Sequence, residues 1–173
     1  MALKTSVLEL ALARISGKTI YIDSCVFIYF LDHYCAPDHG KTDAKVNFFD
    51  VAALILDACA KRKSFGATGD AALAEVLISP YRKNDPIQLA RFRHFFDQKN
   101  FLNVLSHDSS AFNNAAQIAA QYRLKLIDAL HIATAVQANC AFFITNDLTI
   151  QSAIPKSLPI EVICLLDLIT RGP

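Results

Sequence analysis

The sequence has no excess charge of one sign, no paired cysteine motif and no long apolar run. Lysine and arginine number 17 against 16 aspartates and glutamates, so a net charge of +1 gives no field to attract a polyanion. Nucleic-acid binding would therefore need a local basic patch. The five cysteines are an odd number without C-x-x-C spacing, which is typical of reduced thiols in the cytosol. A zinc site at Cys25, His33, Cys35 and His39 is the weaker alternative, because no second ligand pair follows.

Segments that would direct the chain to a membrane are also missing. Glu9 and Arg14 interrupt the apolar stretch that a signal peptide would need, and no run of about 18 uncharged apolar residues occurs. Hydrophobic residues make up 53% of the 173, which is enough for a large core. We therefore expect a cytoplasmic protein with no membrane partner and a single domain over residues 1–173, in which residues 1–18 form an N-terminal helical extension.

Short β-branched or aromatic runs alternate with helical stretches along the chain. The predicted strands are residues 19–23, 64–69, 101–106, 141–145 and 160–165. The predicted helices are residues 7–16, 26–32, 46–63, 70–81, 86–98, 109–122 and 128–138, and residues 33–45 form a loop. A capping box at Ser6 and Glu9 starts the first helix, and Gly17 ends it. Strands joined by helical crossovers predict an α/β fold of three layers, with a mostly parallel central sheet of about five strands and helices on both faces.

Acidic residues stand where the predicted strands end. Asp23 closes the first strand, and Asp147 follows the fourth. Asp128 opens the helix before that fourth strand, and Glu75 lies inside the helix after the second. Ligands of parallel sheets bind beyond the carboxyl ends of the strands, so the four carboxylates can converge there. Converged carboxylates repel one another unless a cation neutralises them, and an all-oxygen set suits Mg²⁺ or Mn²⁺ rather than zinc.

Each acid also has a purely structural explanation. Asp128 and Asp23 fit helix caps, and Asp147 fits a turn residue. Glu75 is the hardest to explain in this way, because its helical neighbours are apolar. A structural explanation is adequate for each of these residues taken alone, but it explains the presence of all four together less well.

Four segments resemble, in order and spacing, the motifs of PIN-domain ribonucleases: TIYIDSCVFIYFL, LAEVLISPYR, LKLIDALHIATAV and FFITND. The VapC-type toxins of VapBC toxin–antitoxin pairs are the most similar members. The resemblance covers residues 19–168 and implies a three-layer PIN-like fold. It also implies a Mg²⁺-dependent endoribonuclease, with Mn²⁺ as the alternative ion, that hydrolyses RNA phosphodiester bonds. The catalytic and metal-binding quartet would be Asp23, Glu75, Asp128 and Asp147.

Polar neighbours of the quartet follow the same pattern with two departures. Supporting roles fall on Ser24, Thr145 and Asn146. Cys25 replaces a polar residue of the first motif, and Gly69 and Ala72 stand where hydroxyl side chains are common in the resembling proteins. We interpret these departures as tuning of the activity. His131 lies three residues after Asp128 and could orient it, but we expect a packed residue outside the site.

Other classes of protein fit less well. A receiver-type signalling domain needs an acidic pair after the first strand and a lysine after the last, and neither is found. A haloacid-type phosphatase needs Asp-x-Asp after the first strand, where Cys25 takes the second position. The remaining alternative is a catalytically weak PIN-like domain that binds RNA or protein.

The resemblance implies three partners: an RNA substrate, a cognate antitoxin and a second copy of the chain in a homodimer. Basic side chains that could contact RNA near the acidic edge are Arg82, Lys83, Arg91, Arg93, His94, Arg123 and Lys125. Phe92, Phe95 and Phe96 are more aromatic residues than one buried helix stripe needs. They predict either a core or a surface for a partner.

Overall fold

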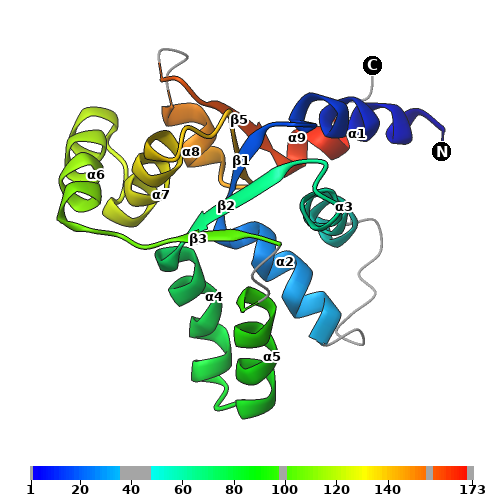
Figure 1. Ribbon diagram of the computed structural model, residues 1–173, viewed down its shortest axis with the longest axis horizontal. Coiled ribbons are helices and arrows are strands. Elements are labelled where there is room, and N and C mark those ends of the chain that lie inside the picture. The colour runs from blue at the N-terminus through cyan, green and yellow to red at the C-terminus, as the bar shows by residue number, and fades with distance from the viewer. Residues whose placement is uncertain (1, 36–47, 98–100, 155–157, 171–173) are drawn as a thin grey trace.

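The central sheet has five parallel strands in the order β3-β2-β1-β4-β5. The computed structural model describes residues 2–35, 48–97, 101–154 and 158–170 (Figure 1). Within these residues the strands are β1 (Thr19–Ile22), β2 (Phe65–Gly69), β3 (Asn103–Leu105), β4 (Phe142–Thr145) and β5 (Glu161–Cys164). All five lie within or overlap the predicted strands, so the parallel α/β sheet is confirmed.

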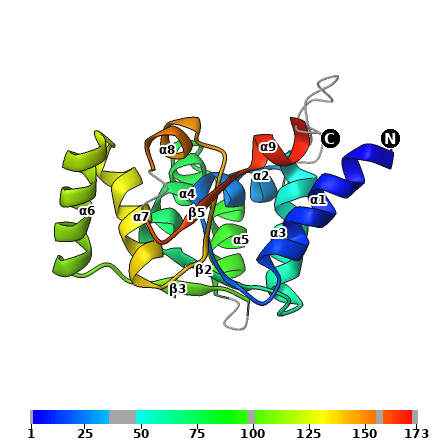
Figure 2. The same cartoon turned by 90° about the horizontal axis from the view of Figure 1, so that it is seen from above.

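Helices cover both faces of this sheet (Figures 1 and 2). They are α1 (Ala2–Ile15), α2 (Ser24–Cys35), α3 (Phe48–Ala60), α4 (Asp70–Arg82), α5 (Pro86–Phe96), α6 (Ser109–Tyr122), α7 (Leu126–Gln137), α8 (Leu148–Ala153) and α9 (Leu165–Thr170). One core contains buried residues of α1, α2, α3 and α5, and the other contains buried residues of α6, α7 and α8. The predicted three layers are therefore present.

Alternate residues of the central strands enter the two cores. Ile20 and Ile22 of β1 belong to the core with α2 and α3, whereas Tyr21 belongs to the core with α6 and α7. In β4, Ile144 belongs to the core with α2 and α3, and Phe143 belongs to the core with α6 and α7. The Tyr21 and Phe143 rings stack with their centroids 5.1 Å apart. Burial on both faces explains why β4 lacks polar alternation.

Several predicted boundaries are wrong. The first helix begins at Ala2, so Ser6 and Glu9 lie inside it and not at its start. Gly17 does follow the helix with a positive φ of 71°, as expected for a terminating glycine. The helix predicted over 70–81 is confirmed to within one residue, since α4 ends at Arg82 with Pro80 inside it. The short helices α8 and α9 were not predicted, since six residues are too few to show a helical period.

Two of the three phenylalanines of α5 are buried in the core, and the third packs against it. Phe92 and Phe96 are buried, and Phe96 contacts Phe27 with ring centroids 5.0 Å apart. Phe95 is half-buried against Phe101, with centroids 5.2 Å apart. Of the two alternatives, the core explanation holds.

Two further sequence predictions concern cysteines and membranes. Cys25, Cys59, Cys140 and Cys164 are free thiols, and the side chain of Cys35 lies outside the described part of the chain. The side chains of His33 and His39 are also outside it, so the structure does not describe the zinc alternative. No helix among the described residues has both the length and the apolar character needed to cross a membrane.

Candidate functional site

The candidate site lies at the carboxyl ends of the central strands. Asp23 stands between β1 and α2, and its backbone N–H donates to the Ile144 carbonyl of β4 at 3.0 Å. Glu75 lies in the second turn of α4, which starts directly after β2. Asp128 lies in the first turn of α7, and Asp147 follows β4 by two residues. The topology therefore brings all four predicted acids to one edge of the sheet.

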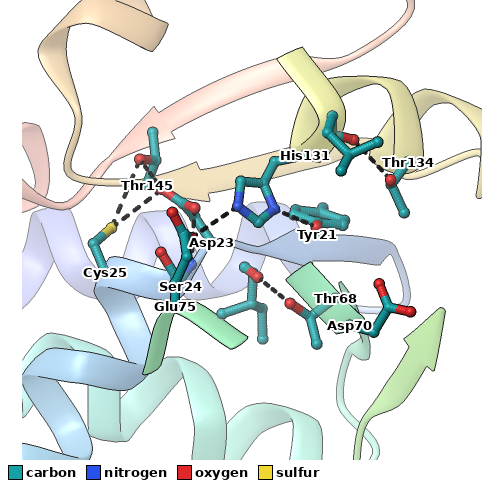
Figure 3. A network of polar contacts seen from close by, with 12 residues as sticks. Tyr21, Asp23, Ser24, Cys25, Thr68, Asp70, Glu75, His131, Thr134 and Thr145 are labelled. Carbon is teal, nitrogen blue, oxygen red and sulfur yellow. Dashed lines mark hydrogen bonds and ion pairs between the residues drawn. The ribbon is translucent and has the colours of Figure 1, made fainter. Parts of the chain in front are cut away.

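Asp23 is buried and held by three donors (Figure 3). Its Oδ1 atom accepts from the Ser24 backbone N–H at 2.8 Å. Its Oδ2 atom accepts from the Thr145 hydroxyl at 2.6 Å and from the Cys25 thiol at 3.3 Å. Donors to a charged carboxylate offset the cost of burying it. Both oxygens of Asp23 are therefore fixed in direction by neighbouring groups.

Cys25 supplies a donor where the sequence pattern led us to expect a lost polar contact. Burial, and then the charge of Asp23, raises the pKa of the Cys25 thiol well above its usual value. The thiol therefore keeps its proton and donates to Asp23, while its sulfur accepts from the Asn146 backbone N–H at 3.2 Å. A thiol is a weak donor, but it fills the place of the missing polar side chain.

Glu75 is oriented by a buried histidine. His131 Nε2 lies 2.9 Å from Glu75 Oε2, and His131 Nδ1 lies 2.8 Å from the Tyr21 hydroxyl. Burial alone would raise the pKa of Glu75, but hydrogen bonds from His131 and Ser24 and the charge of His131 lower it overall. His131 therefore contacts Glu75 rather than orienting Asp128, which was the role considered for it in the sequence.

Thr145 and Asp147 link β4 to the site and to α8. The Thr145 hydroxyl accepts from the Asp147 backbone N–H at 3.0 Å while it donates to Asp23. Asp147 Oδ1 caps α8 by accepting from the backbone N–H groups of Thr149 at 2.7 Å and Ile150 at 3.4 Å. Asp147 is thus the N-cap of α8 and not the turn residue that the sequence suggested as its structural explanation.

The pKa of Asp128 depends on the charges of the other acids. The helix starts at Leu126 with Lys125 as its N-cap, so the N-cap explanation of Asp128 is wrong. Burial, followed by the negative charge of Asp147 and then of Asp23, raises the pKa of Asp128 against the opposing charge of Lys125. The negative charges of Asp147 and Asp23 thus add to the effect of burial at Asp128, and like charges gathered at one edge favour a bound cation.

The remaining polar residues of the motifs have structural contacts. The Asn146 amide donates to the Tyr29 hydroxyl at 3.0 Å and accepts from the Leu166 backbone N–H at 3.1 Å, so it connects β4 to α2 and α9. At Gly69, an added Cβ would lie 2.6 Å from His107 Cε1. The His107 ring thus occupies the space that a side chain at position 69 would need.

Three groups could contact one ion. An oxygen of Asp23, an oxygen of Glu75 and a ring nitrogen of His131 lie within 4.8 Å of one another. The predicted set omitted His131, although a histidine one helical turn after Asp128 in an otherwise apolar helix was a usable signal. Tyr21 was missed too, and its signal was a polar ring inside an aliphatic strand. Because the carboxylate oxygens dominate and His131 Nε2 is engaged with Glu75, the donor set fits Mg²⁺ or Mn²⁺.

Known proteins share this architecture. The family model described as PIN domain matches residues 20–154, which is more than half of the 173 residues. A toxin–antitoxin complex from Klebsiella pneumoniae has a chain that is 18% identical with a TM-score of 0.58, covering 84% of this chain and 97% of that one. No curated protein matches the sequence.

Two further solved structures are similar. VapBC2 from Rickettsia felis, bound to a DNA fragment from its promoter, gives a TM-score of 0.57 at 12% identity, covering 83% of this chain and 98% of that one. DNA-bound VapBC from Salmonella typhimurium gives 0.53 at 15% identity, covering 86% of this chain and 98% of that one. At these identities the likeness shows a shared fold.

Proposed function

The chain belongs to the PIN domain family, and from that premise we propose that it is a Mg²⁺-dependent endoribonuclease, the toxin of a type II toxin–antitoxin pair. The observation that supports this most directly is electrostatic. Asp128 has a raised pKa because of burial and the charges of Asp147 and Asp23, at the same edge where Asp23 approaches Glu75. Unbalanced carboxylates at the carboxyl edge of a parallel sheet are suited to a divalent ion.

Each acid has a proposed role. Asp23 and Asp128 would be the main metal ligands, with Mn²⁺ as the alternative ion, and Glu75 and Asp147 would complete the site. A bound ion would supply charge neutralisation at the scissile phosphate and would lower the pKa of a water. Glu75 has a lowered pKa and is ionised at neutral pH, so it can accept a hydrogen bond from the attacking water. Either Glu75 or Asp147 takes the proton as general base.

Supporting residues hold these acids in place. Thr145 fixes Asp23 and the backbone of Asp147 through one hydroxyl group. Ser24 contributes its backbone N–H to Asp23 and its side chain to Glu75. Fixed ligands reduce the reorganisation that metal binding and the reaction require. Asn146 holds the turn that follows β4.

The RNA backbone would contact cations beside this edge. Lys125 is the cation placed most directly, since its charge lowers the pKa of Asp128. Arg82, Lys83 and Arg123 are exposed and remain candidates. Arg93 is less available, because it donates to the Tyr81 hydroxyl at 2.6 Å and lies over the Tyr81 ring.

The activity is tested by cleavage of RNA across a Mg²⁺ titration, with EDTA as the blank. We expect metal-dependent cleavage by the wild-type protein and a loss of about 100-fold or more in kcat for Asp128→Asn. Asp85→Asn is the matched control, because Asp85 is the N-cap of α5 in the turn after α4 and asparagine caps as well as aspartate. No cleavage above the EDTA blank would contradict the proposal and favour the catalytically weak PIN-like binding domain.

We also propose a cognate antitoxin as the partner, a homodimer as the assembly and the cytoplasm as the location. The similar structures described above are a toxin–antitoxin complex and two VapBC complexes bound to DNA. Expression of the wild-type chain should arrest bacterial growth, and Asp23→Asn should relieve the arrest. Light scattering on the purified chain measures the dimer directly, and a monomer at all concentrations would contradict that part.

A further inference from the structure

We propose that Tyr21 and His131 are positioning residues that hold Glu75 in its metal-facing orientation. This inference rests on the proposed function, because it assigns Glu75 to the metal site. The two residues come from different layers of the fold, since Tyr21 lies on β1 and His131 on α7. Together they connect the centre of the sheet to a carboxylate on α4 (Figure 3).

The contacts form a chain of hydrogen bonds. A carboxylate can only accept, so His131 Nε2 carries the proton that it donates to Glu75 Oε2 at 2.9 Å. The other ring nitrogen, Nδ1, pairs with the Tyr21 hydroxyl, which donates to a neutral ring and accepts from a protonated one. A backbone hydrogen bond from Gly69 is also directed at the Tyr21 oxygen. The relay therefore runs from the Gly69 amide through Tyr21 and His131 to Glu75.

The relay is rigid up to its last member. Tyr21 is fully buried and stacked on Phe143, and His131 is 1% exposed. The side chain of Glu75 is 29% exposed and would otherwise sample several rotamers, which a bound ion would have to restrict. At the other end of the relay, Gly69 leaves room for the Tyr21 hydroxyl, because an added Cβ would lie 3.0 Å from the hydroxyl oxygen. The fixed imidazole ring of His131 thus determines where Glu75 Oε2 lies.

Direct ligation by His131 is the competing explanation of the same cluster. The three candidate ligand atoms lie within 4.8 Å, which alone would allow a nitrogen ligand. However, the Nε2 atom that faces the acids carries the proton donated to Glu75, so its lone pair is not available to an ion. His131 therefore acts through Glu75.

The experiment measures Mn²⁺ binding by electron paramagnetic resonance in parallel with RNA cleavage. His131→Leu removes both ring contacts, His131→Gln keeps an N–H donor toward Glu75, and Tyr21→Phe keeps the stacked ring but removes the hydroxyl. We expect His131→Leu to weaken Mn²⁺ binding about 10-fold or more, in the range that loss of a group supporting a metal ligand produces. His131→Gln should recover part of that loss, and Tyr21→Phe should lose less than His131→Leu.

Thr134→Val is the matched control on the same helix. Its hydroxyl contacts His107 and the Leu130 carbonyl instead of an acid, so Mn²⁺ affinity should stay at the wild-type value. Pulsed resonance spectra of the wild-type Mn²⁺ complex should show no directly coordinated nitrogen. A coordinated nitrogen, an unchanged affinity in His131→Leu, or an equal loss in Thr134→Val would each overturn the positioning role.

The two proposals fail in distinguishable ways. Mn²⁺ binding that depends on His131, without RNA cleavage, would retain the positioning role and reject the nuclease. Cleavage with unchanged binding and kcat in His131→Leu would retain the nuclease and reject the positioning role. A wild-type protein that binds no Mn²⁺ would reject both.

Discussion

Removing the Thr145 hydroxyl should destabilise the protein more than removing its methyl group. Thr145 is fully buried, and its hydroxyl donates to Asp23 Oδ2 at 2.6 Å and accepts from the Asp147 backbone N–H at 3.0 Å. Thr145→Val keeps the shape of the side chain and removes both contacts. Thr145→Ser keeps both contacts and removes one methyl group.

The expected magnitudes follow from these contacts. A hydrogen bond to a charged group contributes about 1.5–3 kcal/mol, and an unsatisfied donor adds about 1 kcal/mol or more. Thr145→Val should therefore lower the free energy of unfolding by about 3 kcal/mol. The methyl group lost in Thr145→Ser is worth roughly 1 kcal/mol. In a chain of this size, these values correspond to shifts in Tm of roughly 6–12 °C and 2–4 °C.

Urea unfolding in EDTA, followed by circular dichroism, measures both variants without a contribution from metal. The slope of the unfolding free energy against urea should match the wild type, so that the difference lies in stability alone. A serine variant as unstable as the valine variant would show that packing, not the hydroxyl, matters at this position. The two hydrogen bonds of the Thr145 hydroxyl, to Asp23 and from Asp147, would then make no measurable contribution to stability.

Three further predictions concern the same edge of the sheet. Asp23→Asn should abolish Mn²⁺ binding while changing the unfolding free energy in EDTA by less than about 2 kcal/mol, because relief of repulsion with Glu75 opposes loss of an acceptor for Thr145. An Asp23→Asn variant that is unfolded in EDTA, or that binds Mn²⁺ with the wild-type affinity, would refute this prediction. Gly69→Ala should lower the unfolding free energy by about 1–3 kcal/mol, since its Cβ would meet the buried ring of His107 at 2.6 Å, and urea unfolding checks this. Finally, Asp128 has a raised pKa, so the metal-free folded state binds its proton more tightly than the unfolded state does. The contribution of Asp128 to the free energy of unfolding should therefore fall as the pH rises from its pKa in the unfolded state through its raised pKa in the folded state. Asp128→Asn should remove this pH dependence.

The sheet could be predicted because its strands depend on local patterns. Phe142, Phe143 and Ile144 form an apolar run without alternation, which is typical of a strand buried on both faces. The segment 64–69 contains two glycines, which weaken a strand, yet it pairs with β1 and β3. At Gly69 the small residue admits the His107 ring, a requirement that only the tertiary structure reveals.

The contact between His131 and Glu75 could not be predicted from spacing. These residues are 56 positions apart, on helices that follow different strands. Local spacing paired His131 with Asp128 instead, because residues three apart share a helix face. The partner in the structure is Glu75, since α4 and α7 both start at the carboxyl edge and each carries its member of the pair in its second turn. A long-range contact of this kind depends on strand order, which the sequence does not state.

The structural and functional explanations of Asp147 do not exclude each other. Its Oδ1 atom caps α8 by accepting from Thr149 and Ile150, so the residue is needed for the helix. Its charge nevertheless raises the pKa of Asp128, so the residue also belongs to the acidic edge. A carboxylate has two oxygens and a charge that acts beyond hydrogen-bond distance, and a cap uses only one of the oxygens. Asparagine would cap α8 equally well, so the cap alone does not require an acid at this position, whereas the balance of charge around Asp128 depends on one.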